Sequence, residues 1–173
     1  MKQALFCGLA LMALTGCHSY SWKPNVPEEL RTVAVPTFRN ESDVVELGSV
    51  TARQVLREFQ REGTFAVKSA DEAALEIQGV IVKAETGRLD YRRENASRSF
   101  ESEMRVAAKV SVVDRRNGKV LIDNREYAVE VNFYGSSDMV AGARDASGRL
   151  AEELARKIVD DVVAGDWKKG EKK

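Results

Sequence analysis

The sequence predicts an α+β fold, a two-layer sandwich in which two helices pack on a small mixed, mainly antiparallel sheet in the order β-α-β-β-β-β-α. Apolar and polar residues alternate over residues 103–112, which is typical of a strand with one buried face. An Asn-Gly pair at 117–118 follows this segment and indicates a hairpin. Apolar residues recur at helical spacing over residues 44–62 and 137–164, which predicts the two helices.

A short strand and the first helix come first along the domain. Apolar and β-branched residues at 32–38 predict a buried strand, and Pro36 cuts this strand or places it near a sheet edge. Asn40 and Ser42 are candidate N-caps for the helix, because their side-chain oxygens can accept backbone N–H groups. Gly63 is expected to end the helix, and residues 65–68 form a second short strand.

Three longer strands follow. The first runs from residue 75 to about residue 85, and its apolar positions change phase near Gly79, where we expect a β-bulge. The second buries Met104, Val106, Ala108, Val110 and Val112 and exposes the residues between them. The third places the following residues on one face: Leu121, Tyr127, Val129, Val131 and Phe133.

The second helix runs from about residue 137 to residue 164 and stops at Gly165. Trp167 is placed to fold back onto the core, so the domain spans residues 32–167. Residues 168–173 are a charged tail that has nothing to bury. The helix has an apolar stripe formed by Val140, Ala143, Ser147, Leu150, Leu154, Ile158 and Val162.

The N-terminus reads as a targeting segment. Lys2 precedes an apolar run at residues 4–15, which is too short to span a bilayer and has the length of a signal-peptide core. The run ends in Leu14-Thr15-Gly16-Cys17, which resembles the lipobox of bacterial lipoproteins. This resemblance implies that residues 1–16 are removed, that Cys17 carries diacylglycerol, and that the new amino terminus is acylated. A plain secretory signal with an incidental cysteine is the alternative.

Residues 17–31 form a polar tether with two prolines between the lipid and the domain. His18 follows the lipidated cysteine. In the sorting rule of enterobacterial lipoproteins, an Asp at this position retains the protein in the inner membrane. Because His18 is not Asp, the rule points to the outer membrane, with the domain facing the periplasm.

The composition excludes several function classes. Lys plus Arg and Asp plus Glu each number 27, so the chain lacks the basic excess of a nucleic-acid binder. One His and two Cys exclude a His/Cys zinc site and a His-dependent catalytic triad, so we expect no metal and no cofactor. No phosphate-loop, dinucleotide-binding or nucleophile-elbow motif is present. Asp160 and Asp161 point in different directions on a helix, and we expect both on a solvated face.

Two basic clusters remain as candidate binding sites, and arginine forks suit phosphate groups. One lies around the loop between the first two long strands, and the other lies in the following hairpin. Because successive turns of a meander fall at opposite ends of a sheet, these are two separate patches. Ordinary solvated loops are the alternative for both. The loop cluster consists of Arg88, Arg92, Arg93 and Arg98, and the hairpin cluster consists of Arg115, Arg116 and Lys119.

Several soft motifs follow one another in a fixed order along the chain. The lipobox precedes a short Pro-containing tether, and the chain ends in a long helix. Between them lie four segments: Arg31-Thr32-Val33-Ala34-Val35-Pro36-Thr37-Phe38-Arg39-Asn40, then Arg57-Glu58-Phe59-Gln60-Arg61-Glu62-Gly63, then Phe65-Ala66-Val67, then Asp114-Arg115-Arg116-Asn117-Gly118-Lys119-Val120-Leu121. This order resembles the LPS-assembly lipoprotein family, LptE.

The resemblance implies a non-enzymatic outer-membrane lipoprotein whose fold is two helices on a small sheet. Such proteins sit in the lumen of a large β-barrel, the LPS-assembly protein LptD, and contact lipopolysaccharide on its way to the outer leaflet. On this basis we expect Glu103, Arg105 and Lys109, on the polar face of the middle strand, to face the barrel. We expect the hairpin cluster, rather than the loop cluster, to bind lipopolysaccharide phosphates.

Two other functions stay open at this point. The opening Thr-Val-Ala-Val-Pro-x-Phe also resembles secretion-channel lipoproteins of the curli type, whose subunits form their own oligomeric pore. Those subunits are longer and carry extra amphipathic strands, which this chain lacks. A lipoprotein enzyme that works with carboxylates only is the third function.

Overall fold

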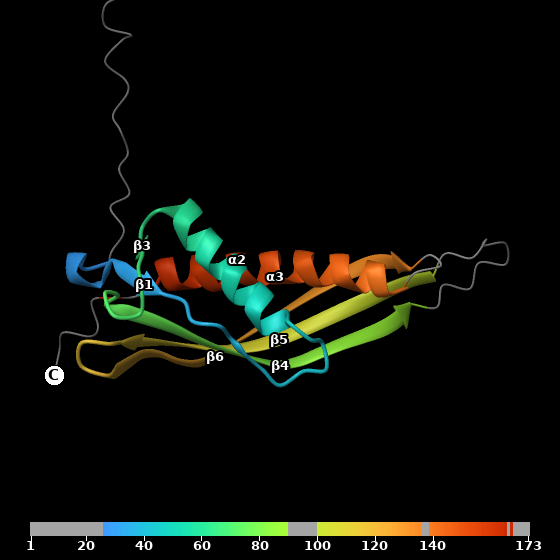
Figure 1. Cartoon of the computed structure of the whole chain (residues 1–173), viewed down its shortest axis with the longest axis horizontal. Helices are drawn as coiled ribbons and strands as arrows, with labels where there is room; N and C mark the ends of the chain where they lie inside the picture. The colour runs from blue at the N-terminus through green and yellow to red at the C-terminus, as the bar shows by residue number, and fades with distance from the viewer. Residues whose placement is uncertain (1–25, 90–99, 136–138, 166, 168–173) are drawn as a thin grey trace, which may run out of the picture.

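Three long antiparallel strands form the body of the sheet: β4 (Leu75–Leu89), β5 (Phe100–Asp114) and β6 (Lys119–Gly135). They are seen in a computed structural model that describes residues 26–89, 100–135, 139–165 and 167 (Figure 1). The C-terminal end of β4 and the β5–β6 hairpin lie at opposite ends of the sheet, as a meander predicts.

Short strands extend the sheet on the β4 side and make it mixed. β1 (Thr32–Ala34) runs parallel to β4 and to β3 (Ala66–Val67), which gives the order β3-β1-β4-β5-β6. β2 (Arg39–Asn40) pairs in parallel with β4 further along. A 3₁₀ turn, η2 (Glu28–Leu30), precedes β1. The predicted fold class and element order are confirmed.

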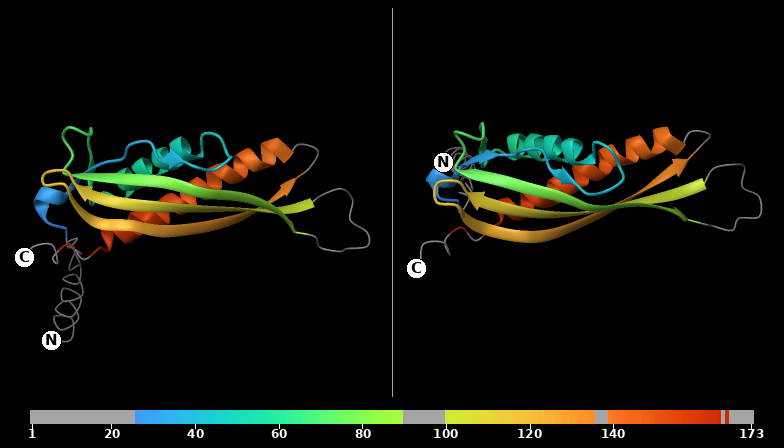
Figure 2. Two further views of the ribbon diagram at one scale, coloured as in Figure 1. Left: turned by 90° about the horizontal axis from the view of Figure 1, so that it is seen from below. Right: turned by 60° about the horizontal axis from the view of Figure 1, so that its bottom comes forward.

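Two helices cover one face of this sheet, α2 (Leu47–Glu62) and α3 (Met139–Val163) (Figure 2). The buried side chains of α3 match the central and C-terminal part of the predicted stripe. Burying this apolar stripe against the sheet is the main source of stability available to the two layers. The core residues of α3 are Ala146, Leu150, Ala151, Leu154, Ala155, Ile158, Val159 and Val162.

The start of α2 differs from the sequence-based expectation. The helix begins at Leu47, after Glu46 with a left-handed φ of 67°. The Asn40 side chain instead organises the preceding turn, because its Oδ1 accepts from the Ser42 N–H at 3.1 Å and its Nδ2 donates to the Val44 carbonyl at 2.8 Å. Asn40 and Ser42 therefore stabilise a turn and do not cap the helix. At the other end, Gly63 has φ 83° and ends the helix as predicted.

The predicted strand at 32–38 is split, because the chain leaves β1 after Ala34 and rejoins the sheet as β2. In between, the buried Phe38 lies over Gly79 of β4. Gly79 therefore makes room for a ring and does not mark a bulge. The register shift lies two residues later, between Ile81 and Lys83, so the expected position of the bulge was wrong.

The alternation along β5 is confirmed, and its even-numbered residues from Met104 to Val112 are buried. Trp167 also folds back as expected. Its ring lies 5.9 Å from that of Phe65, and its Nε1 donates to the Val162 carbonyl at 3.1 Å. Among the described residues, no helix is long and apolar enough to cross a membrane.

The sequence predicts Asp161 on a solvated face, but its carboxylate holds two partners on β6. Its Oδ2 accepts from the Tyr127 hydroxyl and from Arg125 Nη1, each at 2.5 Å, which ties α3 to β6. Burial, with the Asp161 contact as a second cause, raises the pKa of Tyr127. Asp160, its neighbour, is exposed as predicted.

Candidate functional site

The face of the sheet opposite the helices presents a ladder of charges. Arg105 of β5 pairs with Glu103 on its own strand. It also pairs with Glu130 of β6, with 3.1 Å between Arg105 Nε and Glu130 Oε2. Lys109 Nζ lies 3.2 Å from Glu126 Oε1 of β6. Glu103, Arg105 and Lys109 therefore share the outward face, as the alternation predicts, and their charges are balanced within the sheet.

β4 adds a further pair to this face, which we call the outer sheet face. Lys83 Nζ lies 2.8 Å from Glu85 Oε1. Between the Arg105–Glu130 and Lys109–Glu126 ion pairs, Ala107 of β5 lies opposite Ala128 of β6. The outer sheet face is therefore a nearly neutral, hydrophilic surface with small residues at its centre, and no described helix covers it.

The β5–β6 hairpin is rigid, as expected, but its arginines are held by the fold. Arg116 grips the buried Asp114 carboxylate with two bonds, Nε to Oδ1 at 3.0 Å and Nη2 to Oδ2 at 2.8 Å. Hydrogen bonding from Arg116 lowers the pKa of Asp114. Arg115 Nη1 lies 2.5 Å from Glu76 Oε2 of β4. A phosphate at this hairpin would have to compete with these two carboxylates.

The turn itself depends on Gly118, whose φ is 72°. Its N–H donates to the Asp114 carbonyl at 2.8 Å, and the Lys119 N–H donates to Asn117 Oδ1 at 2.8 Å. The Asn-Gly signal therefore does set the turn, and it brings Arg115, Arg116 and Lys119 together at one end of the sheet.

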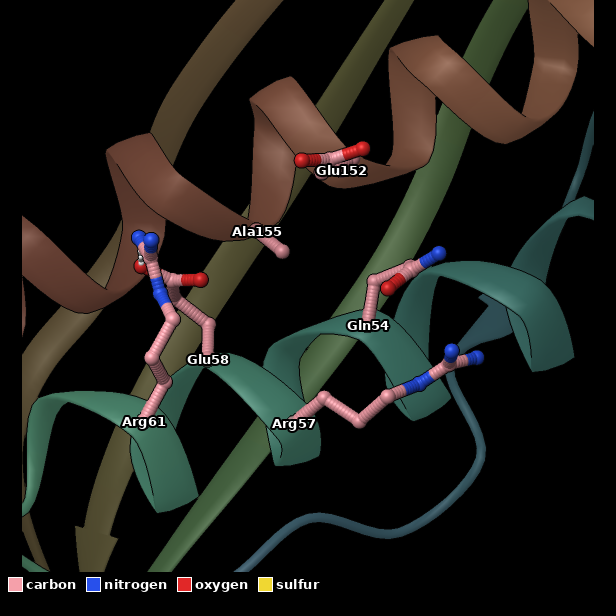
Figure 3. A pocket seen from close by; sticks show the side chains of 6 residues that line it. All are labelled: Gln54, Arg57, Glu58, Arg61, Glu152 and Ala155. Carbon is pink, nitrogen blue, oxygen red and sulfur yellow. Dashed lines mark hydrogen bonds and ion pairs between the residues drawn. The ribbon is translucent and has the colours of Figure 1, made fainter.

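A groove that sequence reasoning missed lies between the two helices (Figure 3). It has a volume of about 190 Å³ and a floor formed by Ala155 of α3. Figure 3 shows Gln54 and Arg57 at one end of the groove, Glu58 and Arg61 at the other, and Glu152 across from them on α3. The only signal in the sequence is the recurrence of arginine every four residues along α2.

Some predicted site residues lie outside the described residues. These are Cys17, Arg92, Arg93 and Arg98, together with the side chain of Arg88. Among the described residues there is no group of His, Cys, Asp and Glu side chains that could hold a metal ion.

Comparison with known families decides the relationship. The model of the LptE family, described as lipopolysaccharide-assembly, matches residues 30–162. The chain belongs to the LptE family. This match runs from the end of η2 to the last turn of α3, and it confirms the expected family of lipopolysaccharide-assembly lipoproteins.

Solved structures share the LptE-type fold at low sequence identity. Protein XCC0632 from Xanthomonas campestris aligns with a TM-score of 0.55 and 9% identity, covering 88% of this chain and 93% of that chain. Protein CT253 from Chlamydia trachomatis aligns with a TM-score of 0.51 and 15% identity, covering 78% of this chain and 96% of that chain. These likenesses concern the fold alone. No curated protein sequence matches the chain.

Proposed function

We propose that this LptE-family protein is an outer-membrane lipoprotein, anchored through Cys17, that plugs the LPS-assembly barrel LptD and assists the insertion of lipopolysaccharide into the outer leaflet. The family match over residues 30–162 is the observation that carries the proposal. It gives the lipopolysaccharide-assembly role, and the partner and the location are inferred from it.

The outer sheet face supports the docking part of the proposal. A barrel lumen is polar and wet, so a plug needs a hydrophilic surface rather than a large apolar patch. Arg105 and Lys109 form such a surface together with their carboxylate partners on β6. Internal charge balance leaves no large repulsive field, so the face can approach a wall of mixed charge without a strong electrostatic penalty.

The β5–β6 hairpin remains our proposed contact for lipopolysaccharide. Its three cations, Arg115, Arg116 and Lys119, are fixed by the turn, which lowers the entropy lost on binding. The pairs with Asp114 and Glu76 restrain two of these cations. Phosphate binding there therefore includes an exchange of one anionic partner for another.

Co-purification tests the barrel partnership. The native lipoprotein should capture a single large outer-membrane barrel, whereas a ring of this chain alone would support the curli-type alternative. A charge swap, Lys109→Glu with Glu126→Lys, keeps the internal ion pair but inverts its direction. The swap should weaken capture while the unfolding temperature stays the same, because an exposed pair contributes only about 0–1 kcal/mol.

A matched control swap is available on α3, where Arg156 pairs with Glu152 at 3.3 Å on the opposite side of the molecule. Arg156→Glu with Glu152→Arg should leave capture unchanged. Equal capture by wild type and the Lys109 swap would move the interface off the outer sheet face. Failure of the wild type to capture any barrel would contradict the proposed partnership itself.

A further inference from the structure

The charged residues of α3 and α2 are arranged differently. Each exposed cation of α3 that makes an ion pair has its acid one turn earlier on the same helix. The pairs are Arg149 with Asp145 at 3.3 Å, Arg156 with Glu152 at 3.3 Å, and Lys157 with Glu153 at 4.0 Å.

On α2 only Arg61 has an acid of this kind, Glu58, one turn earlier on the helix. Glu62 accepts hydrogen bonds from the backbone N–H and the hydroxyl of Thr64 and pairs with no arginine of the helix. Within the part of the chain that the structure describes, the side chains of Arg53 and Arg57 make neither an ion pair nor a hydrogen bond. These two arginines therefore carry the uncompensated charge of the helix.

Arg53 and Arg57 are one helical turn apart and share a face. The positions three and four residues from each of them hold no carboxylate, and like charges at this spacing repel one another. Both side chains are exposed, and they lie away from the buried stripe that includes Ala52, Val55 and Phe59. The fold thus presents two adjacent guanidinium groups to solvent from a rigid element.

The groove beside Arg57 limits what can bind. Gln54 stands next to Arg57 at one end and can donate from its amide (Figure 3). Glu58, Arg61 and Glu152 line the rest of the groove, and the two carboxylates already pair with Arg61 and Arg156, so that part offers an anion no unpaired cation. A ligand with one compact anionic group therefore fits at the Gln54–Arg57 end, one helical turn from Arg53, and a polyanion that fills the groove does not.

We propose that Arg53 and Arg57 form a binding site for a phosphate group carried by a lipid, with Gln54 as an additional donor. Guanidinium groups bind phosphate oxygens through paired, charge-assisted hydrogen bonds, and two of them side by side match the several oxygens of one phosphate. The phosphate can belong to lipopolysaccharide or to a phospholipid headgroup. The choice of a lipid as the carrier of the phosphate rests on the proposed function, whereas the site itself rests on the two unpaired arginines.

The test uses the native lipoprotein in a maltoside detergent, which carries no phosphate that could compete with the probes. Calorimetry measures its affinity for three probes: lipopolysaccharide, dihexanoyl-phosphatidylglycerol and inorganic phosphate. The variant is Arg53→Gln with Arg57→Gln, which keeps helix propensity. The charge-matched control is Arg149→Gln with Arg156→Gln on α3. A third variant, Arg115→Gln with Arg116→Gln, reports on the hairpin.

At about 0.01 M salt the α2 variant should bind lipid phosphate at least tenfold more weakly than wild type, and the α3 control should stay within twofold. The difference should shrink at 0.15 M salt, where the screening length falls from about 30 Å to about 8 Å. A loss for lipopolysaccharide alone assigns the site to that lipid, and a loss for both lipids assigns it to headgroup phosphates in general. The α2 variant should also unfold at a slightly higher temperature, because the repulsion is gone.

Wild-type affinity in the α2 variant for both lipids overturns the inference, and so does a wild type that binds neither lipid. If only the hairpin variant loses affinity, the phosphate site lies at the hairpin, and the proposed function stands without this inference. If the α2 variant loses capture of the barrel but keeps lipid binding, the arginines face an acidic protein surface instead. Failure of the proposed function appears separately, as absence of the barrel from the wild-type purification.

Discussion

The ring of Phe38 lies directly against the backbone of Gly79, so closely that a Cβ at Gly79 would come within 2.3 Å of Phe38 Cδ2. Phe38 is 2% exposed and packs among the core residues. This contact fixes where the segment between β1 and β2 crosses β4. It explains both the glycine inside a long strand and the position of α2, because Gly48 of that helix meets the Phe38 carbonyl from the other side.

Gly79→Ala should therefore destabilise the protein. The added methyl overpacks a buried ring, and such overpacking typically costs about 1–3 kcal/mol. Urea unfolding followed by circular dichroism measures the loss. Gly87→Ala in the same strand is the control, because a Cβ there meets nothing within 4 Å. Phe38→Leu should recover part of the loss in the Gly79→Ala background, and a stable Gly79→Ala single variant would disprove the tight contact.

The carboxylate of Asp114 should make stability depend on pH in acid. The folded-state pKa of Asp114 is lowered from its usual 3.8, chiefly by hydrogen bonding from Arg116. Because the pKa of Asp114 is lowered on folding, this stabilisation is fully present above about pH 5, well above the unfolded-state pKa, and is lost as the pH falls through the folded-state pKa. Asp114→Asn should therefore be less stable than wild type at pH 6, and the difference should narrow towards pH 2. A gap that stays constant over this range would refute the ion-pair explanation.

Trp167 should anchor the C-terminal end of α3. Its ring contacts Phe65, and its indole N–H bonds to the Val162 carbonyl. Replacing a nearly buried Trp by Ala should cost about 3 kcal/mol, whereas Trp167→Phe should lose about 1 kcal/mol, the contribution of the hydrogen bond. Removing residues 168–173 should leave the unfolding temperature unchanged. Equal stability of all three variants would contradict a docked Trp167.

The proposed lipopolysaccharide contact at the hairpin can be tested in two ways: by removing the Arg115 cation, and by removing the carboxylate that Arg115 pairs with. Arg115→Gln should weaken lipopolysaccharide binding at low salt if the hairpin is the contact. Glu76→Gln removes the carboxylate that holds Arg115 and should strengthen binding by a few-fold. Titration of the native lipoprotein with lipopolysaccharide measures both effects. Unchanged affinity in both variants would remove Arg115 from the proposed site.

Much of this architecture is predictable from local pattern. The alternation along β5 and the helical stripe around Leu150 and Ile158 are repeated signals, and each repeat adds to the same conclusion. Features that depend on one distant contact are not predictable in this way. The phase change in β4 predicts a bulge at Gly79. Glycine is instead required there because the ring of Phe38, far away in sequence, packs against its backbone.

The charged sites show the same limit. Composition reveals which cations exist, but not which carboxylate reaches them across the fold. Arg115 seemed available in the sequence and is held by Glu76, which lies 39 residues away. Arg53 and Arg57 have no unusual feature in the sequence, and both lack an ion-pair partner in the described part of the chain. Spacing along a helix was the usable signal, because a helical arginine without an acid one turn away has no local partner.

The central claim is that the outer sheet face lies against a barrel. Ala107 sits at the centre of this face, between Arg105 and Lys109, and is a suitable position for a photo-reactive phenylalanine analogue. Illumination of living cells should crosslink position 107 to a large outer-membrane barrel identified by mass spectrometry. The same analogue at exposed Arg156 on α3 should give a much weaker crosslink to the barrel. Strong crosslinking at position 156 with none at position 107, or a crosslink from position 107 only to a second copy of this chain, would contradict the account.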